Sequence, residues 1–335
     1  MKNPAMPIPI PMRLRHLMLV GLAAFASVLT TPTPAQVVGR AELESFLREH
    51  AHRKGFDADL ARRALGEARV SQGILDAIRR PAEAKPWHQY RQIFMQPERI
   101  EAGRAFMQAE ARALAQAETR HGVAAPVIAA IIGVETFYGR STGKHRVLDA
   151  LATLGFHHPP RASFFQAELA EFIALCAQQG LDPTHPLGSY AGAMGLGQFM
   201  PSSYRAYAVD GDSDGTIDIW TNRTDAIHSV ANYLARHGWE PEAPVVVAVE
   251  PPAGWQAQKP KDFKPAVSIG SLRKQGFVVP KQHGDDTMVS VIALDGEAGQ
   301  EVWLGFRNFY VITRYNRSPL YAMAVLQLAE ALGLP

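Results

Sequence analysis

The first part of the chain after residue 35 carries apolar residues at three- and four-residue spacing, a pattern typical of amphipathic helices. We expect helices over Ala41–Arg53, Asp57–Ala68, Ser71–Arg79 and Pro97–Thr119. The last of these opens on a proline and ends near His121 and Gly122, which are ordinary start and stop signals. Together these helices predict a helical N-terminal domain over residues 36–124.

The pattern stays helical over residues 125–244 and then changes to short β-branched runs between prolines. These runs are Val245–Val249, Ala266–Ile269, Gly276–Val279, Thr287–Leu294 and Gln300–Phe306. They predict a small β domain within residues 245–316. Ser318 and Pro319 then begin a last helix, which runs to Leu332 with Gly333 as its cap. The predicted fold class is mainly α with a small β subdomain, that is, α+β.

The N-terminal 35 residues have the layout of a secretory signal peptide. The basic patch Arg13–His16 precedes an apolar stretch from Leu17 to about Leu29, and Ala35 ends a small-x-Ala cleavage site. The apolar stretch is short for a membrane span, although an uncleaved anchor is the alternative. Cys176 is the only cysteine, so the signal lacks the terminal cysteine of a lipoprotein. We therefore expect a soluble periplasmic protein that is not a lipoprotein.

Composition and charge narrow the class of protein. A chain of 335 residues suggests two or three packed units, and its net charge of +2 gives no strong attraction to nucleic acid. It contains no HExxH segment, which argues against a zinc protease site.

One carboxyl occurs where an apolar residue is expected. In the stretch 125–139, which begins with a helix-initiating proline, Ile128, Ile131, Ile132 and Glu135 fall on one helical face. A carboxyl at the end of such a stripe is desolvated, which raises its pKa and suits it to act as a general acid near neutral pH. The alternative is a glutamate at a helix end that reaches solvent, and spacing alone leaves both open.

The segment 189–203 is dense in small residues and offers partners for such an acid. Its glycines let backbone approach another element or a ligand closely. Ser189 could hydrogen-bond a carboxylate and fix its rotamer, while Gln198 offers a donor and an acceptor beside the apolar Phe199. A phosphate-binding loop is the weaker alternative, because there is no GxGxxG after a strand and no Lys-Ser/Thr pair.

These motifs together resemble a known family. Gly133-Val-Glu-Thr-Phe-Tyr-Gly139, the segment 192–203 and Tyr315-Asn316-Arg-Ser-Pro-Leu-Tyr321 are similar to the lytic murein transglycosylase B family, over nearly the whole mature chain. The resemblance implies a lysozyme-like catalytic core over residues 125–244, joined to the N-terminal domain, which the C-terminal helix within 317–335 rejoins. The β domain within 245–316 then returns the chain to the cleft.

The resemblance also implies roles for individual residues. It makes Glu135 the single catalytic acid and base, with Ser189 and Gln198 beside it. It implies that the sugar-contacting residues are Tyr90, Phe199, Tyr233, Tyr315, Asn316 and Tyr321. The family often has two adjacent arginines before an aromatic pair, but here only Arg161 stands before Phe164-Phe165, which puts one substrate contact in doubt.

An aspartate-rich segment matches the first nine positions of an EF-hand calcium loop. Asp210, Asp212 and Asp214 supply alternate carboxylates, and Thr216 supplies the backbone carbonyl of position seven. Position twelve is a threonine in place of the usual glutamate, and in the resembling family a later aspartate closes a longer loop, here Asp225. We expect this loop, residues 210–225, to bind Ca²⁺ in a structural role, with no cofactor for catalysis. The alternative is an aspartate-rich turn that binds nothing.

The predicted enzyme is a peptidoglycan lytic transglycosylase, in which the resemblance implies 1,6-anhydro-muramic acid ends as the product. One convincing acid suits such an intramolecular reaction, because hydrolysing glycosidases use two carboxylates. A hydrolytic muramidase of the same fold and a non-catalytic peptidoglycan-binding scaffold are the alternatives. We expect a monomer whose partners are glycan strands and not nucleic acid, and we consider proteins of a cell-wall synthesis complex as further partners.

Overall fold

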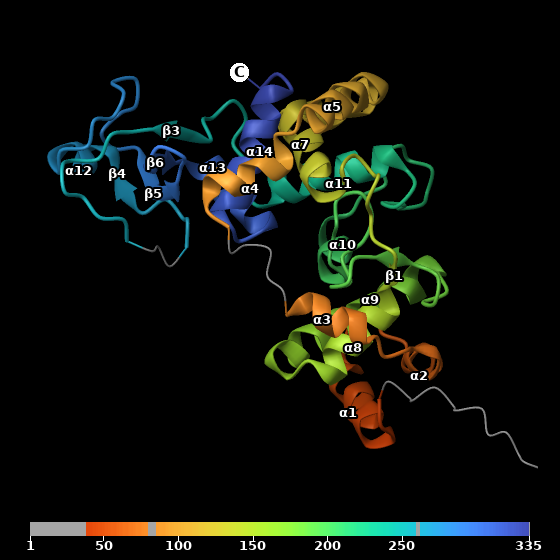
Figure 1. Ribbon diagram of the computed structural model, residues 1–335. Helices are drawn as coiled ribbons and strands as arrows, with labels where there is room; N and C mark the ends of the chain where they lie inside the picture. The colour runs from red at the N-terminus through yellow and green to blue at the C-terminus, as the bar shows by residue number, and fades with distance from the viewer. Residues whose placement is uncertain (1–37, 80–84, 259–261, 335) are drawn as a thin grey trace, which may run out of the picture. The chain divides into compact units, whose positions relative to one another are not determined.

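The computed structural model describes residues 38–79, 85–258 and 262–334 (Figure 1). The predicted signal peptide lies outside these residues. Within the described part of the chain, no helix is both long and apolar enough to cross a membrane.

Within residues 38–79 and 85–124, the structure has six helices before the stretch that carries Glu135. They are α1 (Arg40–His50), α2 (Ala58–Glu67), α3 (Gln72–Ile78), α4 (Trp87–Phe94), α5 (Pro97–Ala109) and α6 (Ala111–His121). Asp57 and Ser71 cap α2 and α3 by accepting hydrogen bonds from Leu60 N and Ile74 N, as their residue types favour. The predicted helices over 41–79 are confirmed.

The single helix predicted over Pro97–Thr119 is wrong, since two helices meet at Glu110. This residue leaves helical geometry with φ −106° and ψ 20°, and its carboxylate pairs with Arg223 at 2.8 Å. The break lets α5 pack on α7 (Ala125–Thr136) while α6 packs on α11 (Arg223–Arg236). The spacing of apolar residues over the whole segment does not reveal a helix break at a single residue. The helix α4 was not predicted from the sequence.

The helices before residue 124 pack in two groups. The first three contact α8 (Val147–His157) and α9 (Ala162–Gln179), whereas α4, α5 and α6 contact α7, α11 or α14 (Pro319–Ala331) (Figure 1). The contact of α14 with α4 and α7 brings the end of the chain to this second group. The domain boundaries proposed from the sequence stay predictions.

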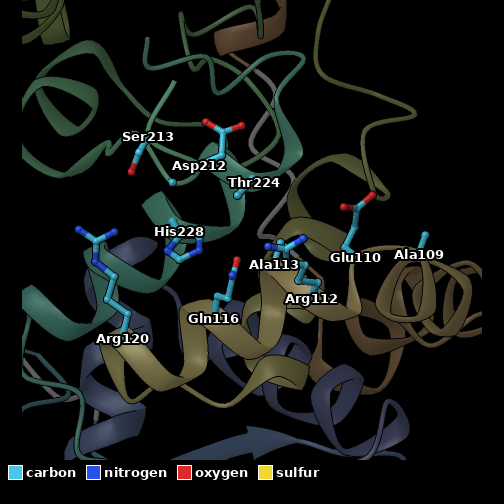
Figure 2. Close-up of a pocket in the computed structure, with 11 residues that line it drawn as sticks. Ala109, Glu110, Arg112, Ala113, Gln116, Arg120, Asp212, Ser213, Thr224 and His228 are labelled. Atoms are coloured by element: carbon cyan, nitrogen blue, oxygen red, sulfur yellow. The ribbon is translucent and has the colours of Figure 1, made fainter. Parts of the chain in front are cut away.

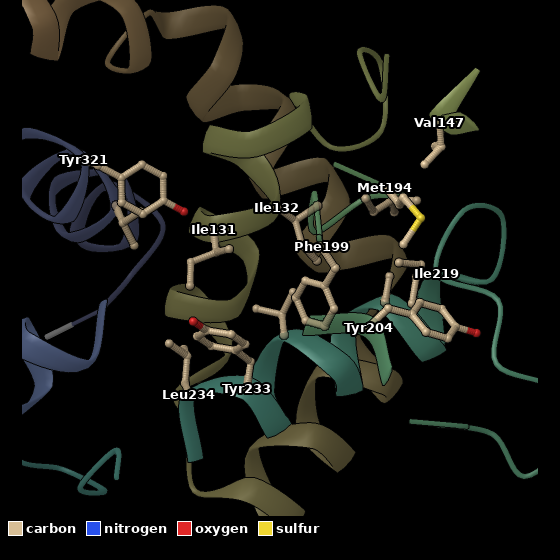
Figure 3. Packing of buried hydrophobic residues seen from close by; sticks show 14 of the residues in the cluster. Ile131, Ile132, Val147, Met194, Phe199, Tyr204, Ile219, Tyr233, Leu234 and Tyr321 are labelled. Atoms are coloured by element: carbon tan, nitrogen blue, oxygen red, sulfur yellow. The ribbon is translucent and has the colours of Figure 1, made fainter. Parts of the chain in front are cut away.

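The helix α7 forms the centre of the main hydrophobic core. Every residue from Val127 to Gly133 is buried, and Ile131 and Ile132 pack among side chains from α11 and the glycine-rich segment, including Phe199 and Leu234 (Figure 3). Short elements complete this region: β1 (His145–Arg146) pairs with β2 (Leu187–Gly188), η2 spans Pro159–Arg161, and α10 spans Pro201–Tyr207. A buried α7 fixes the position of the residues at its C-terminal end.

The β unit is one antiparallel sheet in the order β3-β6-β5-β4. Its strands are β3 (Val246–Ala248), β4 (Val267–Ser268), β5 (Met288–Asp295) and β6 (Gln300–Gly305), with α12 (Ile269–Lys274) packed beside β4. The sheet has its own small core, which contains Val289 and Leu304. The predicted run Gly276–Val279 is not a strand, because only Val278 bridges to Glu250 after the turn at Gly276.

The chain returns from the sheet through α13 (Arg307–Tyr315) into α14. Ser318 caps α14 by accepting a hydrogen bond from Tyr321 N, and Pro319 is its first residue, as the sequence predicts. The predicted fold class, mainly α with a small β subdomain, is confirmed.

Candidate functional site

Glu135 lies in the last turn of α7, where an abrupt change of backbone direction ends the helix. Phe137, Tyr138 and Gly139 all have left-handed φ values, of 52°, 57° and 90°. Non-glycine residues adopt this conformation at an energetic cost of order 1 kcal/mol or more each, so surrounding contacts must hold them there. The backbone that follows Glu135 is therefore strained, and the contacts that hold this backbone also fix the position of the carboxyl.

The Glu135 carboxylate is half-buried and accepts a hydrogen bond from Tyr321 Oη at 2.7 Å. Burial raises its pKa from 4.5 to about 7, and the Tyr321 bond opposes that rise by favouring the charged form. No other hydrogen bond or ion pair to this carboxylate arises within the described residues. A carboxyl with these properties holds a proton near neutral pH and can still meet a ligand.

Aromatic rings from three separate segments gather beside this carboxyl. Tyr321 and Tyr315 are parallel within 9° with centroids 6.5 Å apart. Tyr315 also lies 4.7 Å from Tyr233 and 5.9 Å from Phe199, and its Oη donates to Gly197 O at 2.5 Å. Four residues assigned to sugar contact from the sequence thus form one series of contacts that begins at Glu135.

Gln198 and Ser189 hold the glycine-rich segment in shape. Gln198 has a φ of 51°, and its amide donates to Thr142 O at 3.1 Å and to Gly195 O at 2.9 Å. Ser189 Oγ accepts from Ala191 N and Ala193 N at 3.2 and 3.0 Å. Among the described residues neither side chain bonds Glu135, so the expected bond from Ser189 to a carboxylate is not formed.

The other predicted substrate contacts occupy different settings. Tyr90 is buried in α4 with its ring 5.3 Å from Phe94, and Asn316 is half-buried directly after α13. Arg161 is exposed at the end of η2, with its guanidinium 4.4 Å from the centroid of Phe164. In the described structure no contact joins Arg161 to Glu135. The substrate roles of all three residues stay predictions.

Sequence reasoning missed Thr136, the residue that ties α7 to the glycine-rich segment. Its buried Oγ1 lies 3.0 Å from Leu196 O and accepts from Gly139 N at 3.1 Å. A polar residue next to Glu135 on a buried helix was the available signal. Thr136 links the turn after the acid to the segment that carries Gln198.

The residue Arg99 was also missed. Its guanidinium donates to Gly133 O and lies 4.4 Å from the Phe137 centroid. Tyr138 fits closely beside Gly133, where an added Cβ would be 2.5 Å from Tyr138 Oη. These contacts fix the left-handed turn that follows Glu135.

The aspartate loop brings three of its predicted ligands together. One carboxylate oxygen from each of Asp210, Asp212 and Asp214 lies within 4.8 Å of the others. Backbone N–H groups of Ser213 and Gly215 donate to Asp210 and fold the loop around these carboxylates. Clustered hard oxygen donors with like charge fit a divalent cation such as Ca²⁺.

The residue predicted to close the loop is fully buried at the start of α11. Asp225 accepts from Gly211 N through Oδ1 and from Asp218 N through Oδ2, both at 2.7 Å. The Asp225 carboxylate therefore joins two parts of the loop by accepting from the backbone N–H groups of Gly211 and Asp218, and it lies outside the cluster of three carboxylates. Its role as a ligand stays a prediction.

A cavity of about 630 Å³ lies between α6 and this loop (Figure 2). Arg112, Gln116 and Arg120 line one wall, and Asp212 and His228 line the other. Glu135 does not line this cavity. The cavity lies beside the aspartate loop, and none of its lining residues belongs to the aromatic cluster around Glu135.

The whole chain can be classed by comparison with known proteins. Residues 39–330 match the family described as Transglycosylase SLT domain. The chain therefore belongs to the Transglycosylase SLT domain family, and the resemblance found in the sequence is confirmed.

Among curated proteins, the chain is 40% identical over 301 residues to the membrane-bound lytic murein transglycosylase B of Escherichia coli, a match that covers 87% of this chain and 82% of that protein. It is 48% identical to soluble lytic transglycosylase SltB1 from Pseudomonas aeruginosa, with a TM-score of 0.79 over 87% of this chain and 97% of that one.

Two further solved structures carry ligands. Escherichia coli Slt35 in complex with calcium is 41% identical, with a TM-score of 0.77 over 87% of this chain and 92% of that one. Pseudomonas aeruginosa SltB3 in complex with NAG-NAM-pentapeptide is 31% identical, with a TM-score of 0.74 over 87% of this chain and 78% of that one.

Proposed function

We propose that this lytic transglycosylase cleaves the β-1,4 bond between N-acetylmuramic acid and N-acetylglucosamine of peptidoglycan and leaves 1,6-anhydro ends. The observation that carries the proposal is Glu135, a half-buried carboxyl with a pKa raised by burial to about 7 and a hydrogen bond from Tyr321. Such a group can donate a proton and take one back within one turnover.

Glu135 first donates its proton to the glycosidic oxygen, and the bond from that oxygen to C1 of muramic acid breaks. The carboxylate then accepts the proton of the muramic acid C6 hydroxyl, whose oxygen forms the new bond to C1. Glu135 thus regains the proton that it donated, and no water is consumed. Between the two proton transfers Glu135 is a carboxylate, and Tyr321 stabilises this charged form because its hydroxyl donates a hydrogen bond to it. Tyr315 is half-buried and offers a ring face for sugar contact, whereas the buried rings of Tyr233 and Phe199 pack behind it.

A hydrolytic muramidase would need a second carboxylate to activate water. Within the described residues, no carboxylate pairs with Glu135 or appears among the causes of its pKa shift. This favours the intramolecular reaction over hydrolysis.

The test is a digestion of purified peptidoglycan followed by mass measurement of the products. Wild-type protein should release 1,6-anhydro muropeptides, and Glu135→Gln should lower their rate of release by a factor of about 10² to 10⁴. A matched control is Glu101→Gln, an exposed carboxyl on α5, which should keep full activity. Products that carry one added water would identify a hydrolase, and intact strands would identify a scaffold.

We further propose that Asp210, Asp212, Asp214, the Thr216 carbonyl and Asp225 hold a Ca²⁺ ion. The clustered carboxylates and the calcium complex of Slt35 support this. A bound cation would offset part of the negative charge of the loop and brace the start of α11.

We propose that the natural substrate is glycan that carries stem peptides, and that the protein encounters this glycan in the periplasm after the protein has been exported. The NAG-NAM-pentapeptide complex of SltB3 supports the peptide-bearing substrate. Fractionation of cells that express the full chain tests the location.

A further inference from the structure

The first turn of α5 places a guanidinium group against the left-handed turn that follows Glu135. Arg99 is half-buried, and its guanidinium lies 4.4 Å from the ring centroid of Phe137 and 5.4 Å from that of Phe94, the last residue of α4. The same guanidinium donates a hydrogen bond to Gly133 O in α7. One side chain therefore contacts α4, α7 and the turn after the acid.

The residue before Arg99 reaches the same ring through a second arginine. Glu98 pairs with Arg140 at 3.1 Å, and the Arg140 guanidinium lies 4.5 Å from the Phe137 centroid. Both members of this pair are exposed, so solvent weakens their attraction. Two consecutive residues of α5 thus converge on Phe137, and Arg99 is the more buried of the two arginines that contact its ring.

The setting of Arg99 is unfavourable for the stability of the fold. Burial lowers its pKa, and it forms no ion pair with a described residue. Its Nε and the nearby Tyr138 Oη are both buried without a hydrogen-bond partner in the described part of the chain. Gly133 O already accepts from Phe137 N at 3.1 Å, so this carbonyl does not require a second donor. Because buried charges and unsatisfied donors cost free energy, stability alone does not account for an arginine here.

We propose that Arg99 is a positioning residue, which holds Glu135 in place for proton transfer by fixing Phe137 in the left-handed turn. The inference rests on the proposed function, because it takes Glu135 as the acid. Phe137 follows Glu135 by two residues, and its φ of 52° requires restraint by neighbouring groups. A partly desolvated guanidinium over the ring supplies that restraint. Without it the turn relaxes and the carboxyl moves, and a displacement of about 1 Å can cost a factor of about 10² in rate.

A structural role as a cap of α7 is the competing explanation. A cation that bonds a carbonyl near the end of a helix stabilises that helix. A cap predicts that substitution of Arg99 lowers Tm and leaves the kcat of the folded protein unchanged. A positioning residue predicts the reverse, because substitution removes a buried charge together with its favourable contacts and releases the acid.

The first experiment measures kcat, KM and Tm of Arg99 variants on solubilised glycan strands. Arg99→Met keeps an unbranched side chain that still packs on aromatic rings. It should lower kcat by about tenfold to a hundredfold, with KM within about twofold and Tm within about 3 °C of wild type. Arg99→Lys keeps a charge that can donate to Gly133 O, so it should regain most of the rate. Arg104→Met, at an exposed position of the same helix, is the matched control and should change nothing.

The second experiment asks whether Arg99 acts through the ring of Phe137. Phe137→Leu removes that ring, so the double variant with Arg99→Met should be no slower than the slower single variant. Losses that multiply would overturn the proposal. An unchanged kcat in Arg99→Met, or a fall in Tm that accounts for its whole loss of activity, would do the same.

Failure of the proposed function would have a different signature. Wild-type protein that releases no anhydro product, or Glu135→Gln at the wild-type rate, would count against Glu135 as the acid. An inactive Glu135→Gln beside a fully active Arg99→Met would count against the positioning role alone.

Discussion

Tyr321 Oη lies 2.7 Å from Oε1 of Glu135 and donates a hydrogen bond to it, across 186 positions of sequence. Burial and this bond act on the carboxyl in opposite directions, since burial favours the protonated form and the bond favours the charged form. Their balance sets a pKa of about 7, which suits a group that must give and recover a proton.

The first prediction concerns the pH dependence of cleavage. Tyr321→Phe removes the bond that favours the charged carboxylate, so the pKa of Glu135 rises above about 7. Because the first step needs the protonated acid, kcat/KM falls as pH rises through this pKa, and that fall should move to higher pH in the variant. Tyr204→Phe, which loses a bond to Ile217 O elsewhere, should leave it in place. A shift to lower pH would contradict the assignment.

The second prediction is that Glu135 costs stability at alkaline pH. Its pKa is raised by folding from 4.5 to about 7, so the folded state loses stability as pH rises through that window. Glu135→Gln should be more stable than wild type at pH 8, by on the order of 1–3 kcal/mol after allowance for partial exposure, and equal to it near pH 4. Denaturant unfolding at the two pH values measures this. Glu101→Gln should show no such pH-dependent difference.

The third prediction tests the link through Thr136. Thr136→Val keeps the shape of the side chain but leaves Gly139 N and Leu196 O without their partner. We expect a loss of about 1–3 kcal/mol in the free energy of unfolding and a fall in kcat of about tenfold or more, with a smaller change in KM. Thr136→Ser should restore most of both. A stable fold with a wild-type kcat would show that the acid does not depend on this bridge.

The fourth prediction concerns the close approach of Tyr138 to α7. An alanine at Gly133 would bring its Cβ within 2.5 Å of Tyr138 Oη. Gly133→Ala should therefore destabilise the protein by about 1–3 kcal/mol, as overpacking does, and lower activity. Gly66→Ala, on α2 with open space around it, should be neutral or stabilising by about 0.4–1 kcal/mol. Similar effects of the two substitutions would contradict the packing argument.

The fifth prediction concerns the aspartate loop. Addition of Ca²⁺ to chelator-treated protein should raise Tm, because three like charges within 4.8 Å repel one another without a cation. At a hundredfold excess over Kd the gain is about 2.7 kcal/mol. Asp214→Asn should weaken the response, whereas Asp59→Asn on α2 should not. An unchanged Tm in wild type would exclude the site.

Much of the local structure could be predicted from the sequence, because local preferences decide it. The periodic helices before residue 80, the Ser318 cap of α14 and the small antiparallel sheet follow from patterns that neighbouring residues carry. The break at Glu110 could not be predicted this way, since it serves the packing of α5 and α6 against different helices.

The sequence by itself determined that Glu135 stands at the end of an apolar helix, that the aspartates alternate at ligand spacing, and that the motifs belong together in one family. Only the tertiary structure decided that Tyr321 bonds the acid, that Ser189 bonds backbone instead, and that Thr136 joins α7 to the glycine-rich segment. Helix periodicity and ligand spacing act over a few residues, whereas these contacts join positions far apart in the chain. Their geometry exists only once the helices have packed.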